Sequence, residues 1–241
     1  MNIYSKILLS KQKRKKLFAL LVDPDKFSVR AIEEANKAKA DFILVGGSEI
    51  RTGNFEHCIS VIKKKTKIPL VIFPGNHKQI TKKADAIFLL SLISGRNPNF
   101  LIGEHVLAAK KLKQSKIEII PTGYILINGG KISTTQRITN SIPISEKNIA
   151  LAISTAIAGE LLGMKLIYLE AGSGAKKSVN EKIIRSIKKN ISTPVIVGGG
   201  IDSAEKAKKI LLAGADVIVV GNAAEKNVLV IREISELAHN F

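Results

Sequence analysis

The 241-residue chain has no tryptophan, few tyrosines and a single cysteine, Cys58. One cysteine excludes an internal disulfide and favours a reducing compartment such as the cytoplasm. The scarcity of aromatic side chains argues against a surface that stacks on single-stranded nucleic acid, so no nucleic-acid partner is expected. Residues 1–16 hold no apolar run that suits a signal peptide, and the most apolar stretch, residues 149–164, is too short for a bilayer span. We therefore expect a soluble, cytoplasmic protein that contacts a membrane only peripherally.

Acidic residues are also few. The chain has 20 Asp and Glu against 38 Lys and Arg, which gives a net charge of +18. Such a chain attracts polyanions, including phosphorylated substrates and anionic lipid. The cations are spread along nearly the whole length, however, which is typical of a solvated, lysine-rich surface. The charge alone does not decide between these interpretations.

Short apolar runs rich in β-branched residues recur along the chain and predict eight buried strands. We expect them at residues 17–22, 42–45, 70–73, 86–90, 118–120, 166–169, 195–197 and 217–220. Helical patterns separate most of these runs, which indicates parallel strands joined by right-handed crossovers. The sequence therefore predicts an α/β fold, a TIM-type (β/α)₈ barrel that forms one domain over residues 1–241.

Two segments depart from this regular alternation. Only residues 73–85 separate the third and fourth strands, so the third helix of the outer ring is expected to be reduced or missing. A long segment, residues 121–144, follows the fifth strand, and long loops in this position often carry function. The apolar helix expected at residues 146–162 is either packed deeply or part of a subunit interface.

Short local motifs predict turns at the N-terminal ends of strands and the starts of two helices. An Ala-Asp step precedes three strands, and Asp41, Asp85 and Asp216 are therefore interpreted as structural turn residues at the N-terminal face. Capping boxes at Ser178–Glu181 and Asp202–Glu205 predict the starts of two helices.

Glycines follow the last three predicted strands, where barrel enzymes place their active sites. Gly172-Ser173-Gly174, Gly198-Gly199-Gly200 and Gly221-Asn222 stand at these strand ends. Glycine lets backbone N–H groups approach an anion, and a helix N-terminus behind the turn adds a favourable dipole. The pattern predicts a phosphate site, with tight-turn geometry alone as the alternative.

Two acidic residues stand at other strand ends. Asp23 could hold Mg²⁺ with help from the Ser48 hydroxyl, or it could simply cap an Asp-Pro turn. Glu170 and Tyr168 are two residues apart on one strand, so their side chains share a face. If that face is the barrel interior, Glu170 is a candidate general base; a salt bridge to a lysine is the alternative.

Six motifs together carry a resemblance to a known family. They are LVDPDK (21–26), VGGS (45–48), PTGYIL (121–126), YLEAGSG (168–174), VGGGI (197–201) and VVGNAAE (219–225). Their order and residues resemble the geranylgeranylglyceryl phosphate synthase family, in the second of its two sequence groups. Related bacterial heptaprenylglyceryl phosphate synthases typically end the first strand in Lys-x-Asp-Pro. Leu21 stands in place of that lysine, which favours the geranylgeranyl branch.

The resemblance implies a prenyltransferase that joins a polyprenyl diphosphate to the C3 hydroxyl of sn-glycerol 1-phosphate and releases diphosphate. It implies Mg²⁺ at Asp23 and Ser48, and Glu170 as catalytic base beside Tyr168. The glycerol phosphate site would comprise Tyr168, Leu169, Glu170, Ala171, Gly172, Ser173, Gly174, Gly199, Gly200, Gly221 and Asn222.

The resemblance also implies a barrel without its third helix and a homo-oligomer, either a dimer or a hexamer. The helix at 146–162 and Tyr124 are the expected interface elements. The prenyl chain needs an apolar trench, expected at the missing helix and bordered by Phe73, Phe88, Leu90, Leu92 and Ile93.

Two other classes of function remain open from the residues. A phosphate-binding barrel isomerase or synthase acting on a small phosphorylated metabolite explains the glycine turns, but it explains neither the short third connection nor YLEAGSG. A non-enzymatic basic module that binds nucleic acid or membrane explains only the charge.

Overall fold

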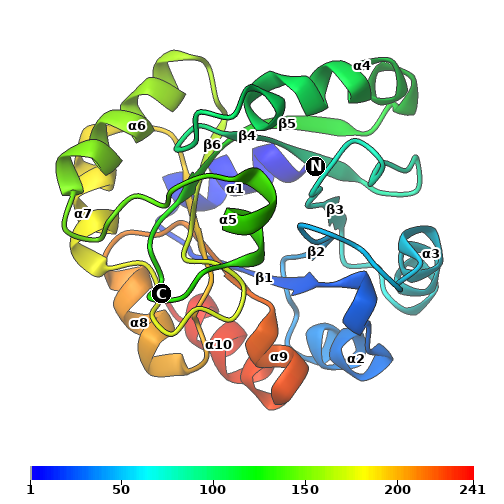
Figure 1. The fold of residues 1–241 in the computed structure, drawn as a ribbon. Helices are drawn as coiled ribbons and strands as arrows, with labels where there is room; N and C mark the ends of the chain where they lie inside the picture. The colour runs from blue at the N-terminus through cyan, green and yellow to red at the C-terminus, as the bar shows by residue number, and fades with distance from the viewer. Residues whose placement is uncertain (1) are drawn as a thin grey trace.

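The computed structural model describes residues 2–241, which form a closed barrel of eight parallel strands (Figure 1). Each strand pairs with the next in the sequence, and β8 closes the barrel against β1. The strands are β1 (Leu17–Val22), β2 (Phe42–Val45), β3 (Leu70–Ile72), β4 (Ala86–Leu92), β5 (Glu118–Leu126), β6 (Leu166–Glu170), β7 (Val195–Gly198) and β8 (Val217–Val220). The predicted barrel is confirmed.

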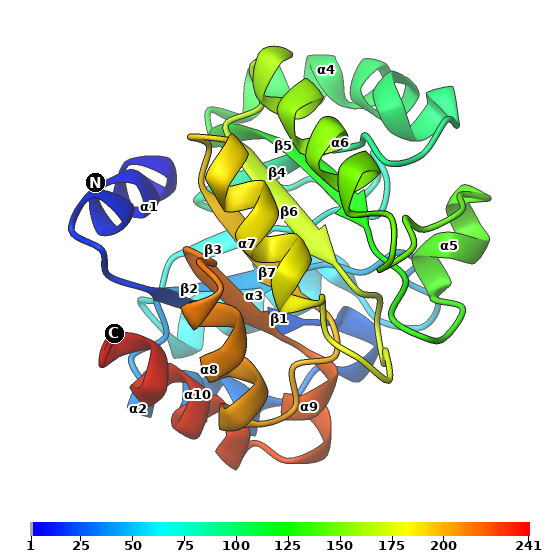
Figure 2. The same ribbon diagram turned by 90° about the vertical axis from the view of Figure 1, so that its left-hand side faces the viewer.

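Helices surround the barrel, and Figure 2 shows α1 and α5 at its opposite ends. The helices are α1 (Ile3–Gln12), α2 (Val29–Lys37), α3 (Phe55–Lys65), α4 (Glu104–Ser115), α5 (Thr134–Thr139), α6 (Ile149–Leu161), α7 (Glu181–Asn190), α8 (Ala204–Leu212), α9 (Asn222–Lys226) and α10 (Leu229–His239). Short turns η1 (Pro24–Lys26) and η2 (Asn99–Gly103) precede α2 and α4. Within residues 2–241, no helix is both long enough and apolar enough to cross a bilayer.

The connection between β3 and β4 contains no helix, which confirms the expected loss of the third helix of the ring. The outer face of β4 therefore lacks the third helix on one side, and α4 follows on the other.

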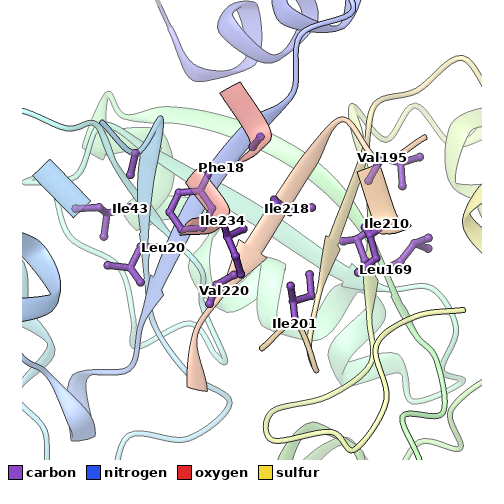
Figure 3. Packing of buried hydrophobic residues seen from close by; sticks show 14 of the residues in the cluster. Phe18, Leu20, Ile43, Leu169, Val195, Ile201, Ile210, Ile218, Val220 and Ile234 are labelled. Carbon is purple, nitrogen blue, oxygen red and sulfur yellow. The ribbon is translucent and has the colours of Figure 1, made fainter. Parts of the chain in front are cut away.

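The core has two layers because successive side chains of a strand point to opposite sides of the barrel wall. In β1, Ala19 points into the barrel, whereas Phe18 and Leu20 point outward to the helices. Figure 3 shows part of the outer layer, where Phe18 and Ile234 pack between β1 and α10. This alternation leaves the inner layer free to present polar groups at the strand ends.

The N-terminal face is held by carboxylates that accept backbone N–H groups. Asp41, Asp85 and Asp216 accept from Phe18, Leu70 and Val195, the first or second residues of neighbouring strands. Their expected structural role is confirmed. Glu118 accepts the N–H groups of Ile3 and Tyr4 and fixes α1 under the same face.

Strand β5 extends beyond its predicted end at Ile120. Pro121 and Gly123 read as breakers, yet residues 118–124 pair with all of β4. A residue's N–H and C=O point to the same side of a strand, and the Pro121 carbonyl accepts from Lys165, just before β6 begins. An N–H at position 121 would point to the same side, toward residues that precede β6. Proline therefore removes no hydrogen bond from the β5–β6 ladder. The remainder of the long segment contains α5.

Three helix starts also differ from the sequence prediction. Asn180 caps α7 and Ser203 caps α8, so the predicted boxes starting at Ser178 and Asp202 are wrong. Each helix begins where a side-chain oxygen accepts an N–H two or three residues ahead, and Asp202 pairs with Lys206 instead. Helix α6 begins at Ile149, capped by Asn148, rather than at residue 146.

Candidate functional site

A polar cavity of about 360 Å³ opens at the C-terminal ends of the strands. Most of the predicted site residues line it: Asp23, Ser48, Tyr168, Glu170, Ser173, Gly174, Gly199, Gly200, Gly221 and Asn222. They come from β1, β2, β6, β7 and β8 and the turns after them, so residues far apart in sequence converge at one mouth. This is the position of the active site in barrels of this type.

The turn after β7 needs glycine at two successive positions. Gly199 and Gly200 have φ of 82° and 68°, in the left-handed region that glycine adopts readily. A side chain at Gly199 would meet the Glu170 carboxylate and lie 2.8 Å from the Gly172 nitrogen. A side chain at Gly200 would lie 2.6 Å from the Lys177 carbonyl oxygen. The bare backbone keeps this wall of the cavity open to an anion.

Asn222 joins the turns after β6 and β8. Its Oδ1 accepts the Gly174 N–H at 2.9 Å and the Ser173 hydroxyl at 2.8 Å. Asn222 also begins α9, whose preceding residue, Gly221, provides no side-chain cap. The first N–H groups of α9 are therefore left for another acceptor, which suits a phosphate.

Glu170 lies at the base of this cavity, with 6% of its surface exposed. Burial raises its pKa to about 7, although the Gly172 N–H donates to its Oε1 at 2.7 Å and favours the charged form. The alternative reading, a salt bridge to a lysine, is absent from the ion pairs of residues 2–241. A carboxylate with a pKa near neutrality can accept a proton during a reaction.

The Tyr168 side chain lies beside Glu170 at the wall of the cavity. In the part of the chain that the structure describes, its hydroxyl is the one buried side-chain polar atom without a hydrogen-bond partner. Burial and the nearby Glu170 charge raise the pKa of Tyr168, which keeps the phenol protonated. A buried, unpaired donor that faces a cavity is suited to a ligand oxygen.

Asp23 and Ser48 reach the same cavity from β1 and β2. Asp23 Oδ1 accepts the Asp25 N–H at 3.0 Å, so the expected capping role is present. Burial raises the Asp23 pKa, and no side-chain cation pairs with it among residues 2–241. Ser48 Oγ lies 2.8 Å from Thr135 Oγ1 of α5. No group of three His, Cys, Asp or Glu side chains suited to a metal occurs in the same range.

A single free carboxylate with a nearby hydroxyl still fits Mg²⁺. Mg²⁺ prefers oxygen ligands, keeps several waters and commonly uses one or two carboxylates together with substrate phosphates. Asp23 Oδ1 would lie 3.5 Å from a side chain at Gly47, which places it next to the Ser48 turn. The donor set is thus compatible with a metal that arrives with a phosphorylated ligand.

An apolar trench opens from the same mouth and follows the outer face of β4, between α4 and the β3–β4 connection. Its mouth is formed by Phe73, Leu90, Leu92, Phe100, Tyr124 and Ile138, and its outer part by Ile80, Ile87, Leu89, Ala108 and Leu112. The missing helix between β3 and β4 leaves room for it. Contacts between His77 and Glu104 connect the two sides, α4 and the β3–β4 connection. We call this feature the trench.

The predicted border of the trench is correct in three of its five residues. Phe73, Leu90 and Leu92 line it. Phe88 instead points into the barrel and packs edge-on against Phe42, while Ile93 packs against the outer core. The error arises because the trench leaves the barrel interior and continues along outward-facing positions of β4.

Four other predicted residues lie away from their expected places. Leu169 and Ala171 are buried in the outer core, and the Ala171 N–H donates to the Gly198 carbonyl, so neither reaches the cavity. Tyr124, an expected interface residue, is buried at the mouth of the trench, with its ring 5.5 Å from that of Tyr168. Gly172 does not line the cavity, although its N–H holds Glu170.

Sequence reasoning missed the contributions of α5 and the loop after Ser48. Thr134, Thr135 and Arg137 of α5 line the cavity, as do Glu49 and Arg51. Asp25 holds this loop by accepting the N–H groups of Arg51 and Thr52. The length of the segment after β5 was the available signal for α5.

The fold and the cavity are those of a (β/α)₈-barrel enzyme with glycine turns at the last strand ends and a buried carboxylate, Glu170, at the base of the same cavity. The chain matches the PcrB family over residues 10–238, and it belongs to that family. The resemblance found in the sequence is therefore confirmed.

Curated relatives of the chain carry the name geranylgeranylglyceryl phosphate synthase. One from Chitinophaga pinensis is 45% identical, with 99% of this chain and 96% of the relative covered. One from Pyrococcus horikoshii is 42% identical, with 92% and 88% covered. A crystal structure of the (S)-3-O-geranylgeranylglyceryl phosphate synthase from Thermoplasma acidophilum in complex with sn-glycerol-1-phosphate is 36% identical, with 100% of each chain covered and a TM-score of 0.93.

Proposed function

We propose that this chain is a prenyltransferase of the geranylgeranylglyceryl phosphate synthase type. It transfers a polyprenyl group, with geranylgeranyl diphosphate as the expected donor, to the C3 hydroxyl of sn-glycerol 1-phosphate. The observation that carries the proposal is one mouth shared by the glycine-walled cavity, the Glu170 carboxylate and the trench. The Thermoplasma relative that binds sn-glycerol-1-phosphate supports the choice of acceptor.

The phosphate of the acceptor is proposed to bind the turns after β6, β7 and β8. Ser173, Gly174, Gly199, Gly200, Gly221 and Asn222 form these turns at the cavity. This anchorage directs the glycerol hydroxyls toward Glu170 and Tyr168, which lie deeper. Tyr168, whose buried hydroxyl has no hydrogen-bond partner among residues 2–241, donates a hydrogen bond to an acceptor oxygen. Holding both substrates in one geometry supplies much of the acceleration.

The proposed reaction breaks one bond, forms one bond and transfers one proton. The bond between the prenyl C1 and the diphosphate oxygen breaks, and a bond between C1 and the glycerol C3 oxygen forms. Glu170 accepts the hydroxyl proton, and diphosphate leaves. Burial holds the Glu170 pKa at about 7, so the carboxylate is a stronger base than an ordinary glutamate, and about half of it is deprotonated at neutral pH.

Mg²⁺ is proposed as the cofactor, with Asp23 and Ser48 as its protein ligands. When bound there, it would neutralise charge on the diphosphate and improve it as a leaving group. No side-chain cation among residues 2–241 pairs with Asp23, and Ser48 contacts Thr135 through its hydroxyl. Ser48 lines both the trench and the cavity, and Asp23 lines the cavity next to the Ser48 turn.

Diphosphate release is the direct test of this function. Incubation with geranylgeranyl diphosphate, sn-glycerol 1-phosphate and Mg²⁺ should release diphosphate and yield the prenyl ether. EDTA, or replacement of the acceptor by sn-glycerol 3-phosphate, should strongly reduce the product. Thermal stabilisation by sugar phosphates, with no response to glycerol phosphate and no diphosphate release, would instead favour another phosphate-binding barrel enzyme.

A bulky residue in the trench should shorten the accepted prenyl chain. Leu89 faces the outer part of the trench, past the mouth. Leu89→Trp should lower kcat/KM for geranylgeranyl diphosphate about tenfold relative to geranyl diphosphate, since overpacking a filled apolar site costs about 1–3 kcal/mol. The control is Leu151→Trp on the exposed side of α6, where the ratio should not change. An unchanged ratio for Leu89→Trp would place the prenyl chain elsewhere.

A homo-oligomer, dimer or hexamer, is also part of the proposal. Helix α6 carries exposed Leu151, Leu161 and the adjacent Leu162, which support an interface there. A cytoplasmic location is proposed as well, because the single cysteine, Cys58, is a free thiol and the chain can form no internal disulfide.

A further inference from the structure

The outer side of α4 combines exposed apolar residues with unpaired lysines. Ile102 of η2 and Val106 and Leu107 of α4 are 58%, 67% and 63% exposed. Lys110 and Lys111 stand four residues after Val106 and Leu107, and therefore on the same side of the helix. We call these five residues the α4 patch.

The charge around the α4 patch is strongly one-sided. Between residues 86 and 117 the chain has a single acidic residue, Glu104, which accepts from His77. The same stretch carries Arg96, Lys110, Lys111, Lys113 and Lys116. Within residues 2–241, none of these five cations pairs with a carboxylate. The patch is thus complementary to an anionic surface.

The α4 patch is the outer side of a helix whose inner side walls the trench. Ala108 and Leu112 line the trench, whereas Val106 and Leu107 face solvent. In Figure 1, α4 lies at the upper right edge of the barrel, next to β4 and β5. A surface that covered the patch would therefore adjoin the wall of the compartment proposed for the prenyl chain.

We propose that the α4 patch docks onto a lipid bilayer that contains anionic head groups. The apolar side chains enter the interfacial region while the lysines contact the head groups, as in interfacial amphipathic helices. The inference rests on the proposed function in one respect: a prenyl donor and a prenylated product both partition into lipid, and docking beside the trench shortens their transfer. The vesicle binding depends only on the α4 patch, and it can be measured without any substrate.

Vesicle sedimentation with the full chain tests this docking. The protein should sediment with vesicles of phosphatidylglycerol, much less with phosphatidylcholine, and less as salt is raised. Val106→Ser/Leu107→Ser should lower the partition constant about tenfold or more. Lys110→Gln/Lys111→Gln should lower it about fivefold for each lysine. The control is Leu212→Ser/Leu229→Ser, which removes two leucines of α8 and α10 that are 63% and 53% exposed, and it should leave binding unchanged.

Several outcomes would overturn the proposal. Absence of sedimentation with phosphatidylglycerol, or equal losses in the α4 variants and in Leu212→Ser/Leu229→Ser, would exclude docking through this patch. Light scattering that showed a smaller assembly for Val106→Ser/Leu107→Ser, with vesicle binding intact, would assign the patch to a second copy of the chain. Diphosphate release from soluble geranyl diphosphate, without vesicles, should be unaffected in all variants. Its absence in the unmodified protein would contradict the proposed function rather than the docking.

Discussion

Replacing Glu170 with glutamine should lower kcat/KM for prenyl transfer by about 10²–10⁴-fold, the usual range for loss of a general base. Glutamine keeps the size of the side chain and an oxygen that can accept the Gly172 N–H. The unmodified enzyme should gain activity as pH rises through about 7, because Glu170 must lose its proton to act. The variant should show little of that rise. The measurement is initial diphosphate release from pH 5.5 to 8.5.

Glu170→Gln should also raise the free energy of unfolding, because the folded state raises the pKa of Glu170. Burial raises the pKa of Glu170 from 4.5 to about 7 in the folded protein, so between these values the folded state holds a proton that the unfolded state releases. The unfolding free energy therefore falls with rising pH in this window. Glu170→Gln removes the penalty, which amounts to at most about 3 kcal/mol above pH 7.

Thermal unfolding at pH 5 and pH 8 separates a catalytic carboxylate from a structural one. We expect the variant to melt higher than the unmodified protein at pH 8 and close to it at pH 5. Glu49→Gln, which removes an exposed carboxylate paired with Arg51, should leave the pH profile in place. A stable Glu170→Gln enzyme with nearly full activity and the same pH profile would exclude Glu170 as the base.

The barrel could be predicted from the sequence because its strands are continuous apolar runs. Strands β1, β2 and β8 begin and end at the predicted residues, since both sides of a parallel strand are buried and only the loops are polar. The end of β5 could not be predicted, because Pro121 and Gly123 are turn formers locally. Their place in the strand depends on β4 and β6, which are distant in the sequence.

The site could be predicted where it depends on strand order alone. The ends of β1, β2, β6, β7 and β8 must meet at one face of a barrel, so Asp23, Ser48, Glu170, Gly199 and Asn222 converge. Strand alternation placed Tyr168 and Glu170 on one face. The same alternation excludes Leu169 and Ala171 from the cavity, because their side chains point outward. The resemblance assigns the whole YLEAGSG motif to the glycerol phosphate site.

The route of the trench needed the structure. Its mouth uses inward positions of β4, such as Leu90, while its outer part uses outward positions, such as Ile87 and Leu89. Both faces contribute because the third helix of the ring, which would pack beside the outside of this strand, is missing. A local pattern shows that a helix is missing, but it does not show which side chains replace it.

Replacing Asp23 with asparagine should lower kcat/KM by about 10²–10³-fold, because a metal at the leaving group supplies several kcal/mol of charge stabilisation. Asparagine retains an oxygen that can accept the Asp25 N–H, so the turn after β1 should keep its conformation. Removal of the negative charge should weaken Mg²⁺ binding in the presence of diphosphate. Calorimetric titration measures that binding without turnover, and raised Mg²⁺ should restore part of the activity.

Asp202→Asn is the matched control for the charge. Asp202 lines the same cavity, but its carboxylate pairs with Lys206 at 2.8 Å, so it is not free to bind a cation. Metal affinity and the Mg²⁺ dependence of diphosphate release should be unchanged in this variant. Equal losses of Mg²⁺ affinity in the two variants would mean that the metal responds to the total charge of the cavity, and Asp23 would lose its role as ligand. The distinction is sharp because Asp23, unlike Asp202, has no side-chain cation as a partner.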